Sequence, residues 1–357
     1  MKTYIKFLLN LFSVSFVKMV MIFFGIIIII NILEEVQFFN EYEAGYFLPL
    51  LLSVLNAPSI LFEMLPFIFL ISTQFFFIKL IDSNELEIFK YKGLTNTKIV
   101  KIISILSFFI GIIFILFFYS FSSLLKNEYL IIKNKYVNDG KYLAVINNNG
   151  LWLRENFEDK KSIINARKIK GSLLIEVLIS EFDKDFNLIQ TIESNKIDIS
   201  SYSWKIFNPK ISKNNETINI SSMNFYSNYN IEKINTLFSN LSSQSIYGLI
   251  NLRKNYKSLD LSLTEIDSHF HKIASYPFYL TLITILTSIV MFNIKRQKNS
   301  LYRLILGIFL SVTIYYISNF FYALGIGEKI PLFLSIWFPL FILSLINIIF
   351  IMKLNEK

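Results

Sequence analysis

Apolar residues gather along this chain in six long blocks separated by polar connections. Each block reaches the ~20 residues that an α-helix needs to cross a hydrocarbon core about 30 Å thick. Three blocks precede a long polar segment, residues 126–272, and three follow it. The blocks are residues 13–33, 57–81, 102–125, 273–294, 304–327 and 330–352. The pattern predicts an α-helical membrane protein with six transmembrane helices, in which residues 126–272 form a domain inserted between residues 1–125 and 273–357.

Two of the blocks contain residues that are unusual in a membrane span. Lys18 lies in the first, where its long stem can carry the ammonium to the lipid headgroups. The second contains Glu63 and Pro66, and neighbouring helices can satisfy the carbonyl that a proline frees. An ionisable residue inside a span is a functional candidate, so Glu63 is a candidate for substrate binding. Snorkelling to the interface and pairing with a neighbouring helix are the alternatives.

Lysine and arginine collect on one side of the predicted helices. Positive charge close to helix ends marks the cytoplasmic side of a membrane protein. The two short loops on the other side, residues 34–56 and 328–329, hold only Lys329. With the N-terminus inside, the cytoplasmic side holds Lys2, Lys6, Lys18, Lys79, Lys90, Lys92, Lys98, Lys101, Lys295, Arg296, Lys298, Arg303, Lys353 and Lys357. Both termini are therefore predicted to be cytoplasmic, and the large polar segment is predicted to face out.

The polar segment is predicted to be mainly β structure. Leu173, Ile175, Val177 and Ile179 alternate with other residues, and residues 202–206 alternate in the same way. Turn signals follow at Asp139-Gly140, Gly171 and Asn208-Pro209. Short strands with such spacing favour a sandwich or a barrel. The last third changes to helical spacing, which predicts helices over residues 246–256 and 262–274, the second leading into the fourth span.

The connection between the second and third spans has a separate pattern. Asp82 and Ser83 are expected to cap a short helix, Glu85 and Glu87 would lie in its first turn, and Gly93 would end it in a left-handed conformation. The segment therefore predicts a short amphipathic helix that suits a cytosolic partner. An ordinary interfacial turn with its charges among the headgroups is the alternative.

Composition narrows the function classes. The chain is 54% hydrophobic with a formal charge of +9, but its basic residues are mostly lysines without interleaved stacking aromatics, so a nucleic-acid partner is not expected. It contains no cysteine, which excludes disulfides and cysteine-based sites. His269 and His271 lie two apart, on different sides of a helix, so no metal site is expected. The sequence lacks a G-x-x-x-x-G-K-[ST] phosphate loop, so ATP would be bound elsewhere.

Several motifs, taken in order, resemble one family. Asn84, Glu85, Leu86 and Gly93 are similar to the S-E-L-x-x-x-x-x-x-G coupling-helix motif of the lipopolysaccharide-export permeases LptF and LptG. Residues 150–155 resemble the G-L-W stretch that opens the periplasmic domain, which favours LptG over LptF. Residues 245–258 resemble the amphipathic stretch before the fourth span, and residues 327–331 the entry to the last helix. Each motif alone is weak, but their order and spacing are specific and cover nearly the whole chain.

The resemblance implies a role and a set of partners. Such a chain pairs with a sister permease of the LptF type, and a dimeric cytosolic ATPase drives the pair. The two membrane halves take lipopolysaccharide from the outer leaflet of the bacterial inner membrane, and a periplasmic β-jellyroll passes it to a periplasmic bridge protein. The ATPase-coupling residues would be Asn84, Glu85, Leu86, Glu87 and Gly93. The chain itself would be neither an enzyme nor the holder of a cofactor.

One departure concerns charge at the outer end of the first helix. Family members tend to have basic residues there, whereas this chain has Glu34 and Glu35, which would repel phosphate. Lys126, Lys133 and Lys135 follow the third span and are candidates to bind headgroup phosphates as point charges. The alternative is that they are ordinary solvated lysines. The glycolipid is therefore left open.

Two functions of other classes are weighed against the permease. An intramembrane glycolipid-modifying transferase would need several acidic or histidine residues at one membrane depth, and the spans offer little beyond Glu63. A periplasmic sensor or scaffold protein would need a sizeable cytosolic output domain, and the cytosolic segments are short.

Overall fold

The computed structural model describes residues 3–40, 45, 47–134, 136, 151–157, 160–184, 186–213, 216–231, 233–234, 240–258, 262–293 and 300–354. The chain divides into two compact units. The helical unit comprises Met1–Leu125 and Thr264–Lys357, and the β unit comprises Lys126–Leu263.

Among the residues that the structure describes, six helical stretches are long and apolar enough to cross a membrane, which confirms the predicted class of fold. Each predicted span coincides with one helical stretch to within two residues at the ends where it is the longer, and the first four stretches run well beyond the apolar block at one or both ends. The stretches are α1 (Thr3–Phe39), α2 (Phe47–Asp82), the run from α4 (Asn96–Ile113) through the π-helical η1 (Phe114–Tyr119) into α5 (Ser120–Asn134), α8 (Thr264–Asn293), α9 (Ser300–Ile326) and α10 (Leu332–Met352).

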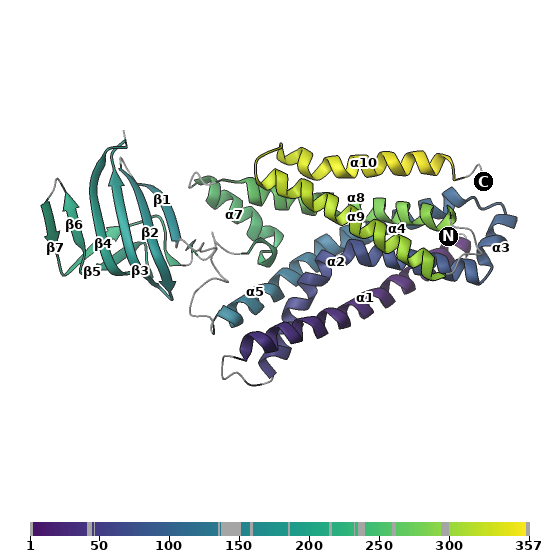
Figure 1. Cartoon of the computed structure of the whole chain (residues 1–357), viewed down its shortest axis with the longest axis horizontal. Helices are drawn as coiled ribbons and strands as arrows, with labels where there is room; N and C mark the ends of the chain where they lie inside the picture. The colour runs from purple at the N-terminus through teal and green to yellow at the C-terminus, as the bar shows by residue number, and fades with distance from the viewer. Residues whose placement is uncertain are drawn as a thin grey trace. The chain divides into compact units, whose positions relative to one another are not determined.

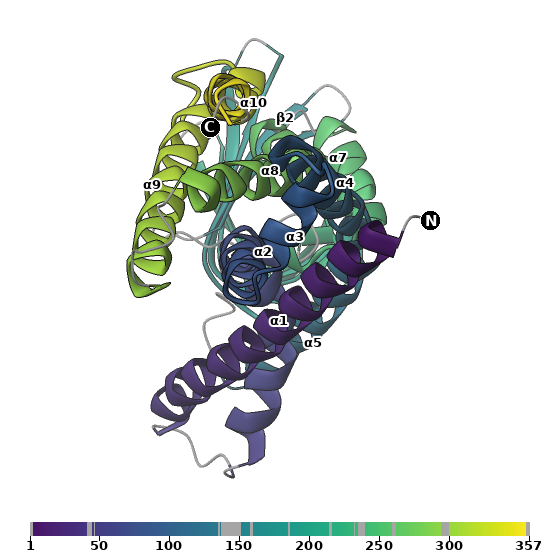
Figure 2. The same cartoon turned by 90° about the vertical axis from the view of Figure 1, so that its right-hand side faces the viewer.

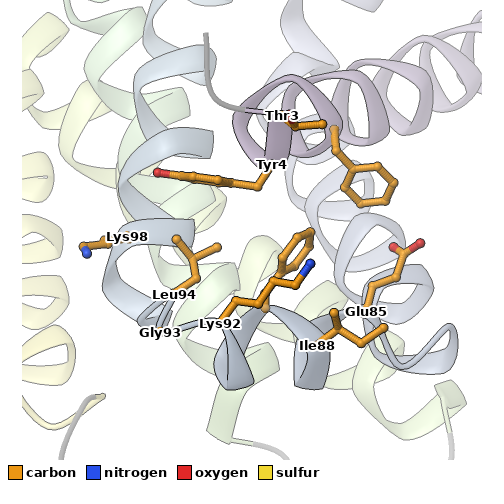
Figure 3. A pocket seen from close by; sticks show the side chains of 10 residues that line it. Thr3, Tyr4, Glu85, Ile88, Lys92, Gly93, Leu94 and Lys98 are labelled. Atoms are coloured by element: carbon orange, nitrogen blue, oxygen red, sulfur yellow. The ribbon is translucent and has the colours of Figure 1, made fainter.

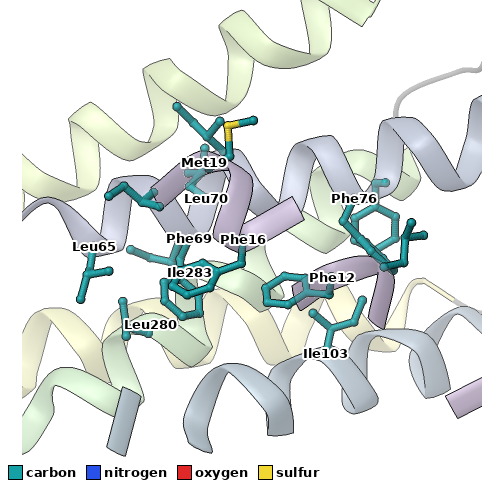
Figure 4. Packing of buried hydrophobic residues seen from close by; sticks show 14 of the residues in the cluster. Phe12, Phe16, Met19, Leu65, Phe69, Leu70, Phe76, Ile103, Leu280 and Ile283 are labelled. Atoms are coloured by element: carbon teal, nitrogen blue, oxygen red, sulfur yellow. The ribbon is translucent and has the colours of Figure 1, made fainter. Parts of the chain in front are cut away.

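Helix α2 is the centre of the helical unit. It packs along α1 and also contacts α8 and α9 (Figure 2). Its inner face meets α1 through aromatic pairs, with the ring centroids of Phe16 and Phe69 4.7 Å apart and those of Phe12 and Phe76 5.9 Å apart (Figure 4). In lipid, the close packing of such large side chains, rather than their removal from water, favours one arrangement of the helices over others.

Small residues set how closely the other helices approach. A Cβ added to Gly307 of α9 would overlap the Gln74 side chain of α2. A Cβ on Gly111 of α4 would lie 2.9 Å from the Pro277 Cα of α8. Small residues allow membrane helices to pack backbone against backbone. The α4–α8 contact is further held by a hydrogen bond of 3.0 Å between the Thr284 and Ser107 hydroxyls.

The described strands of the β unit form one antiparallel sheet, which confirms the predicted β domain between the third and fourth spans (Figure 1). The main path of strands runs β1-β2-β3-β4-β5-β8, while β6 pairs with β4 and β7 pairs with β6. The strands are β1 (Leu151–Phe157), β2 (Lys160–Lys170), β3 (Leu173–Phe182), β4 (Leu188–Asp198), β5 (Ser203–Phe207), β6 (Lys210–Lys213), β7 (Glu216–Asn219) and β8 (Ser222–Tyr226). The expected turn at Asp139-Gly140 lies outside the described residues.

The predicted single face of residues 173–179 is wrong for its first half. Val177 and Ile179 are buried as expected, but towards the start of β3 the buried residue is Leu174 rather than its neighbours. The change occurs at Glu176, whose φ of 50° is not that of a regular strand. Because side-chain direction alternates along a strand, one irregular residue exchanges the two faces. The strand partners change in step: Ala166 and Ser194 are buried beside Val177, and Ile169 and Ile197 beside Leu174.

A buried carboxylate links the two ends of the strand path. Glu155 of β1 accepts hydrogen bonds from the Ser227 hydroxyl (2.9 Å) and the Asn228 amide, which follow β8 directly. Lys233 lies nearby and donates to the Asn228 carbonyl (2.9 Å). Burial raises the pKa of the Glu155 carboxyl above its usual value, against the lowering effect of these donors and of the Lys233 charge.

The helical part of the polar segment also matches its prediction. Helix α7 (Ile246–Ser258) covers the expected residues 246–256. The second expected helix, residues 262–274, is the beginning of α8, which starts at Thr264 and continues without a break through Pro277 into the fourth span.

Candidate functional site

The short helix α3 (Glu85–Tyr91) connects α2 to α4. It lies at the end of the helical unit where α1 begins and α10 ends (Figure 1). The prediction that Asp82 and Ser83 cap it is wrong. Asp82 is the last residue of α2, and the Ser83 hydroxyl donates back to the Lys79 carbonyl (2.8 Å). Asn84, in a left-handed conformation with φ 60°, makes the corner between the two helices instead.

The far end of α3 is closed as predicted. Gly93 has a φ of 81°, which glycine adopts without the steric cost of a Cβ. Its amide donates to the Lys90 carbonyl (2.9 Å), and the Leu94 amide donates to the Phe89 carbonyl (3.0 Å). Thr95 then caps α4 by accepting from the Lys98 amide. Both ends of α3 are therefore tied directly to membrane helices, so a push on α3 would be passed to α2 and α4.

Helix α3 has one face in the protein and one face in solvent. Leu86 and Phe89 pack against the helical core, where the Phe89 ring lies 5.8 Å from that of Phe7 in α1. On the opposite face the side chains of Ile88 and Tyr91 are 50% and 90% exposed. Two large apolar side chains one turn apart, left uncovered on a short helix, are typical of a surface that another protein covers.

A cleft of about 610 Å³ separates α3 from the first turns of α1 and α4 (Figure 3). We call it the α3 cleft. Tyr4 and Phe7 of α1 form one wall, Glu85 and Ile88 belong to α3, and Lys98 comes from α4. A carboxylate and an ammonium thus line the same opening. The cleft is lined by residues at both ends of α3, Glu85 at its start and Lys92 just after its end, and lies next to the exposed apolar face.

Glu63, the ionisable residue of the second span, lies deeper in its helix than the sequence indicated. Because α2 begins at Phe47 rather than near residue 57, Glu63 is in its middle turns, with an exposed side chain. A second polar contact lies beside it: the Tyr276 hydroxyl of α8 donates to the carbonyl of Phe62, the residue before Glu63. A role of Glu63 in binding substrate stays a prediction.

The three lysines that follow the third span differ in their surroundings. Lys126 is half-buried. Lys133 is buried, and its ammonium donates to the Tyr129 hydroxyl one turn earlier (2.9 Å). Lys135 lies outside the described residues. The structure therefore places Lys133 among packed side chains rather than projecting as a free point charge, and phosphate binding by the three stays a prediction.

The acidic pair at the end of α1 is divided between two environments. Glu34 is exposed, whereas Glu35 is buried beside α2. One turn earlier the buried Asn31 accepts a hydrogen bond from Asn56 of α2 (3.2 Å). Only one of the two carboxylates therefore lies on the surface of this chain.

A polar cluster that sequence reasoning missed lies around the two histidines. Nε2 of His269 and the Tyr119 hydroxyl are 2.8 Å apart in a hydrogen bond between α8 and the π-helical η1. His271 accepts from the Trp337 indole of α10 (3.4 Å). The histidines contact different helices, as their spacing predicted. The only sequence signal for these contacts was a pair of histidines at the start of an apolar block.

The described features are those of a multi-pass membrane protein with a short connecting helix and an inserted β domain. A family model described as "Lipopolysaccharide export system permease LptF/LptG" matches residues 6–353. The chain belongs to the LptF/LptG permease family. Within this LptF/LptG protein, the G-L-W stretch continues into the start of β1, where Trp152 is exposed between the buried Leu151 and Leu153. No curated protein matched the chain.

Proposed function

We propose that this LptF/LptG protein is one of two permease subunits in an ATP-driven transporter that extracts lipopolysaccharide or a related glycolipid from the inner membrane. The observation that carries the proposal is α3, a helix joined directly to α2 and α4 with an exposed apolar face, together with membership of a lipopolysaccharide-export permease family. In the proposed complex, a dimeric cytosolic ATPase binds α3 and holds the ATP.

The direction of the chain in the membrane is part of the proposal. Helix α3, the beginning of α1 and the end of α10 lie at one end of the helical unit (Figure 1). That end contains Lys79, Lys90, Lys92, Lys98, Lys101 and Lys353. By the positive-inside rule we assign it to the cytoplasm and the β unit to the periplasm. ATP binding by the partner would then move α3, and with it α2 and α4.

A sister permease of the LptF type is proposed to complete the membrane part. Helices α1 and α9 are the spans least covered by the rest of this chain. In their most apolar parts only 22% and 6% of the residues are buried, against 72% for α2. Two weakly covered helices that both pack on α2 support an interface with a second membrane subunit on that side. The residues of the G-L-W stretch favour LptG as this chain's own type.

The β unit is proposed to receive the glycolipid and pass it to a periplasmic bridge protein. The edge strands of the antiparallel sheet support the second task, because an edge strand can pair with a strand of a partner protein. The glycolipid-modifying transferase and the sensor or scaffold remain alternative functions; the family match weighs against both.

The proposal can be tested with the purified complex. The chain would be co-purified with its neighbouring membrane and ATPase subunits, placed in proteoliposomes, and assayed for ATP-dependent release of glycolipid to the bridge protein. Glu85→Arg puts a third positive charge into the α3 cleft beside Lys92 and Lys98. We expect it to abolish coupled release while membrane insertion is unchanged.

Glu216→Arg in β7 is the matched control, because Glu216 is an exposed carboxylate remote in sequence from α3. It should leave release unchanged. Native rates of release in the Glu85→Arg complex would contradict the coupling role of α3, and absence of glycolipid from the purified native complex would contradict the proposed substrate.

A further inference from the structure

A second opening in the helical unit lies between α4, α8 and α10. It is a groove of about 590 Å³, which we call the α4 groove. Its α4 wall runs from Thr97 to Phe109 in steps of three and four residues, and the facing wall contains Thr281 and Ile285 of α8 and Ile351 of α10. Neither the coupling role of α3 nor the proposed partners use this surface.

The groove is open to the surroundings of the helices. Ile105 and Phe109, both in its α4 wall, are 48% and 57% exposed. In a membrane-spanning helix such side chains face lipid. Beyond Phe109, α4 and α8 pack against each other at Gly111 and Pro277.

The length of the groove corresponds to one leaflet. At a rise of 1.5 Å per residue, the twelve steps from Thr97 to Phe109 cover about 18 Å, and the eight steps from Lys101 cover about 12 Å. Half of a hydrocarbon core is about 15 Å. A lipid acyl chain ends at that depth, whereas a transmembrane helix of a partner would continue past Gly111 through the second leaflet.

Charge is placed at one end of the groove only. Lys101 is exposed at the end that carries α3, next to Thr97, and the rest of the lining is apolar apart from two further hydroxyls, those of Ser104 and Thr281. Lys101 has no ion pair with any described residue. An ammonium above an apolar channel is complementary to a lipid with an anionic headgroup, since each lysine near a membrane surface adds attraction for such lipids.

A second feature points to a ligand between the ammonium and the apolar depth. Ser104 is 7% exposed, lies in the groove wall, and its hydroxyl has no hydrogen-bond partner among the described residues. The neighbouring serine behaves differently: Ser107 donates to the Ile103 carbonyl (3.0 Å). A buried hydroxyl without a partner is costly. Placed one turn below Lys101, it lies at the depth of the ester carbonyls of a phospholipid.

We propose that the α4 groove binds one anionic membrane phospholipid, with its phosphate at Lys101, an ester oxygen at Ser104 and an acyl chain along Ile105 and Phe109. The leaflet that supplies it is the one on the α3 side. The site requires only a membrane around the helices, so it does not depend on the proposed coupling to an ATPase.

The test uses the full chain, purified with its partner subunits, in nanodiscs that contain equal amounts of phosphatidylglycerol and phosphatidylcholine. One of the two lipids carries a photoreactive diazirine on its acyl chain, and cross-linked peptides are identified by mass spectrometry. We expect peptides of α4 and α8 that line the groove to be labelled about fivefold more by phosphatidylglycerol, the factor expected for one lysine at the surface.

Four variants separate headgroup from chain binding. Lys101→Gln should remove the preference for phosphatidylglycerol, while Lys79→Gln, an exposed lysine of α2 at the same end, should keep it. Ile105→Trp should block the groove and abolish labelling there by both lipids. Ile113→Trp is its control, because Ile113 is an equally exposed isoleucine of the same helix outside the groove.

Three outcomes would overturn the proposal: equal labelling by both lipids in the native protein, groove labelling that survives Ile105→Trp, or cross-links from the groove to a partner subunit's helix in place of lipid. None of these would affect coupled release in the Glu85→Arg experiment, so failure of the lipid site and failure of the proposed function are distinguishable.

Discussion

The two faces of α3 lead to a prediction that separates docking from folding. Tyr91 and Ile88 form the exposed face, so replacing either by alanine removes few contacts within this chain. Alanine is also a better helix former than both residues, by a few tenths of a kcal/mol. The Tyr91→Ala and Ile88→Ala proteins should therefore fold with native stability.

Docking to the ATPase should be weakened by both changes. A tyrosine that anchors an interface contributes about 2 kcal/mol or more, which is roughly a 30-fold change in Kd. Ile88 is half exposed, so about half of the 1.5–3 kcal/mol for a fully buried side chain is available, or roughly threefold to twelvefold in Kd. The inward-facing Phe89→Ala should instead lower the thermal unfolding temperature, because it leaves a cavity beside Phe7.

The assay is the affinity of the purified ATPase for the permease complex in nanodiscs, with thermal unfolding measured on the same samples. Tyr247→Ala is the matched control, since Tyr247 is 74% exposed on α7. Native affinity for both Tyr91→Ala and Ile88→Ala would refute the reasoning. So would a loss of affinity that follows thermal stability, because the exposed face would then have no docking role.

Three further predictions concern the substrate lysines, the helix packing and the β unit. Lys126→Ala and Lys133→Ala should both weaken photo-cross-linking to phosphorylated glycolipid, and Lys133→Ala should also lower thermal stability, because it removes the buried hydrogen bond to the Tyr129 hydroxyl. Unchanged cross-linking in both variants would remove the two lysines from the site. Gly111→Ala should destabilise the protein by about 1–3 kcal/mol in thermal unfolding, because its Cβ meets the Pro277 backbone, while Gly25→Ala, with open space around it, should be neutral. Since burial raises the pKa of Glu155, its protonated form favours folding, so this contribution is present at low pH and is lost as the pH rises through the raised pKa. The protection of β1 amides from hydrogen exchange should therefore fall with rising pH in the native chain and not in Glu155→Gln. The same pH dependence in both proteins would contradict the stabilising role of protonated Glu155.

The apolar blocks predicted the six spans because a run of about 20 apolar residues matches the hydrocarbon core, and a helix satisfies its own backbone hydrogen bonds there. Helix α1 nevertheless extends well beyond its block: it begins at Thr3, and Leu8 and Phe12 of the added turns are buried in the helical core. Gly93 could be predicted as the end of α3 because only glycine adopts its conformation freely. The role of Asn84 could not, because Asp82 and Ser83 have the same capping propensity and the length of α2 decides which residue makes the corner.

The contacts that define the sites are mostly long-range, and no local pattern contains them. Tyr119 and His269 are 150 positions apart, and Glu155 meets Ser227 across the ends of the sheet. In β3, an alternating pattern predicted one buried face, but the irregular backbone at Glu176 exchanges the faces halfway. The α4 groove does have a sequence signal, a stripe from Thr97 to Phe109 at helical spacing, although only the packing of α8 and α10 makes it an opening.

The central claim is that α3 and the β unit lie on opposite sides of the membrane, with α3 in the cytoplasm. The chain has no cysteine, so single cysteines can be placed at Lys90 of α3 and at the exposed Tyr202 beside β5 without a background signal. In intact cells, a thiol reagent that does not cross the inner membrane should label the cysteine at position 202 and not the one at position 90, which should react only after the membrane is opened. Labelling of position 90 in intact cells, or protection of position 202, would contradict the account.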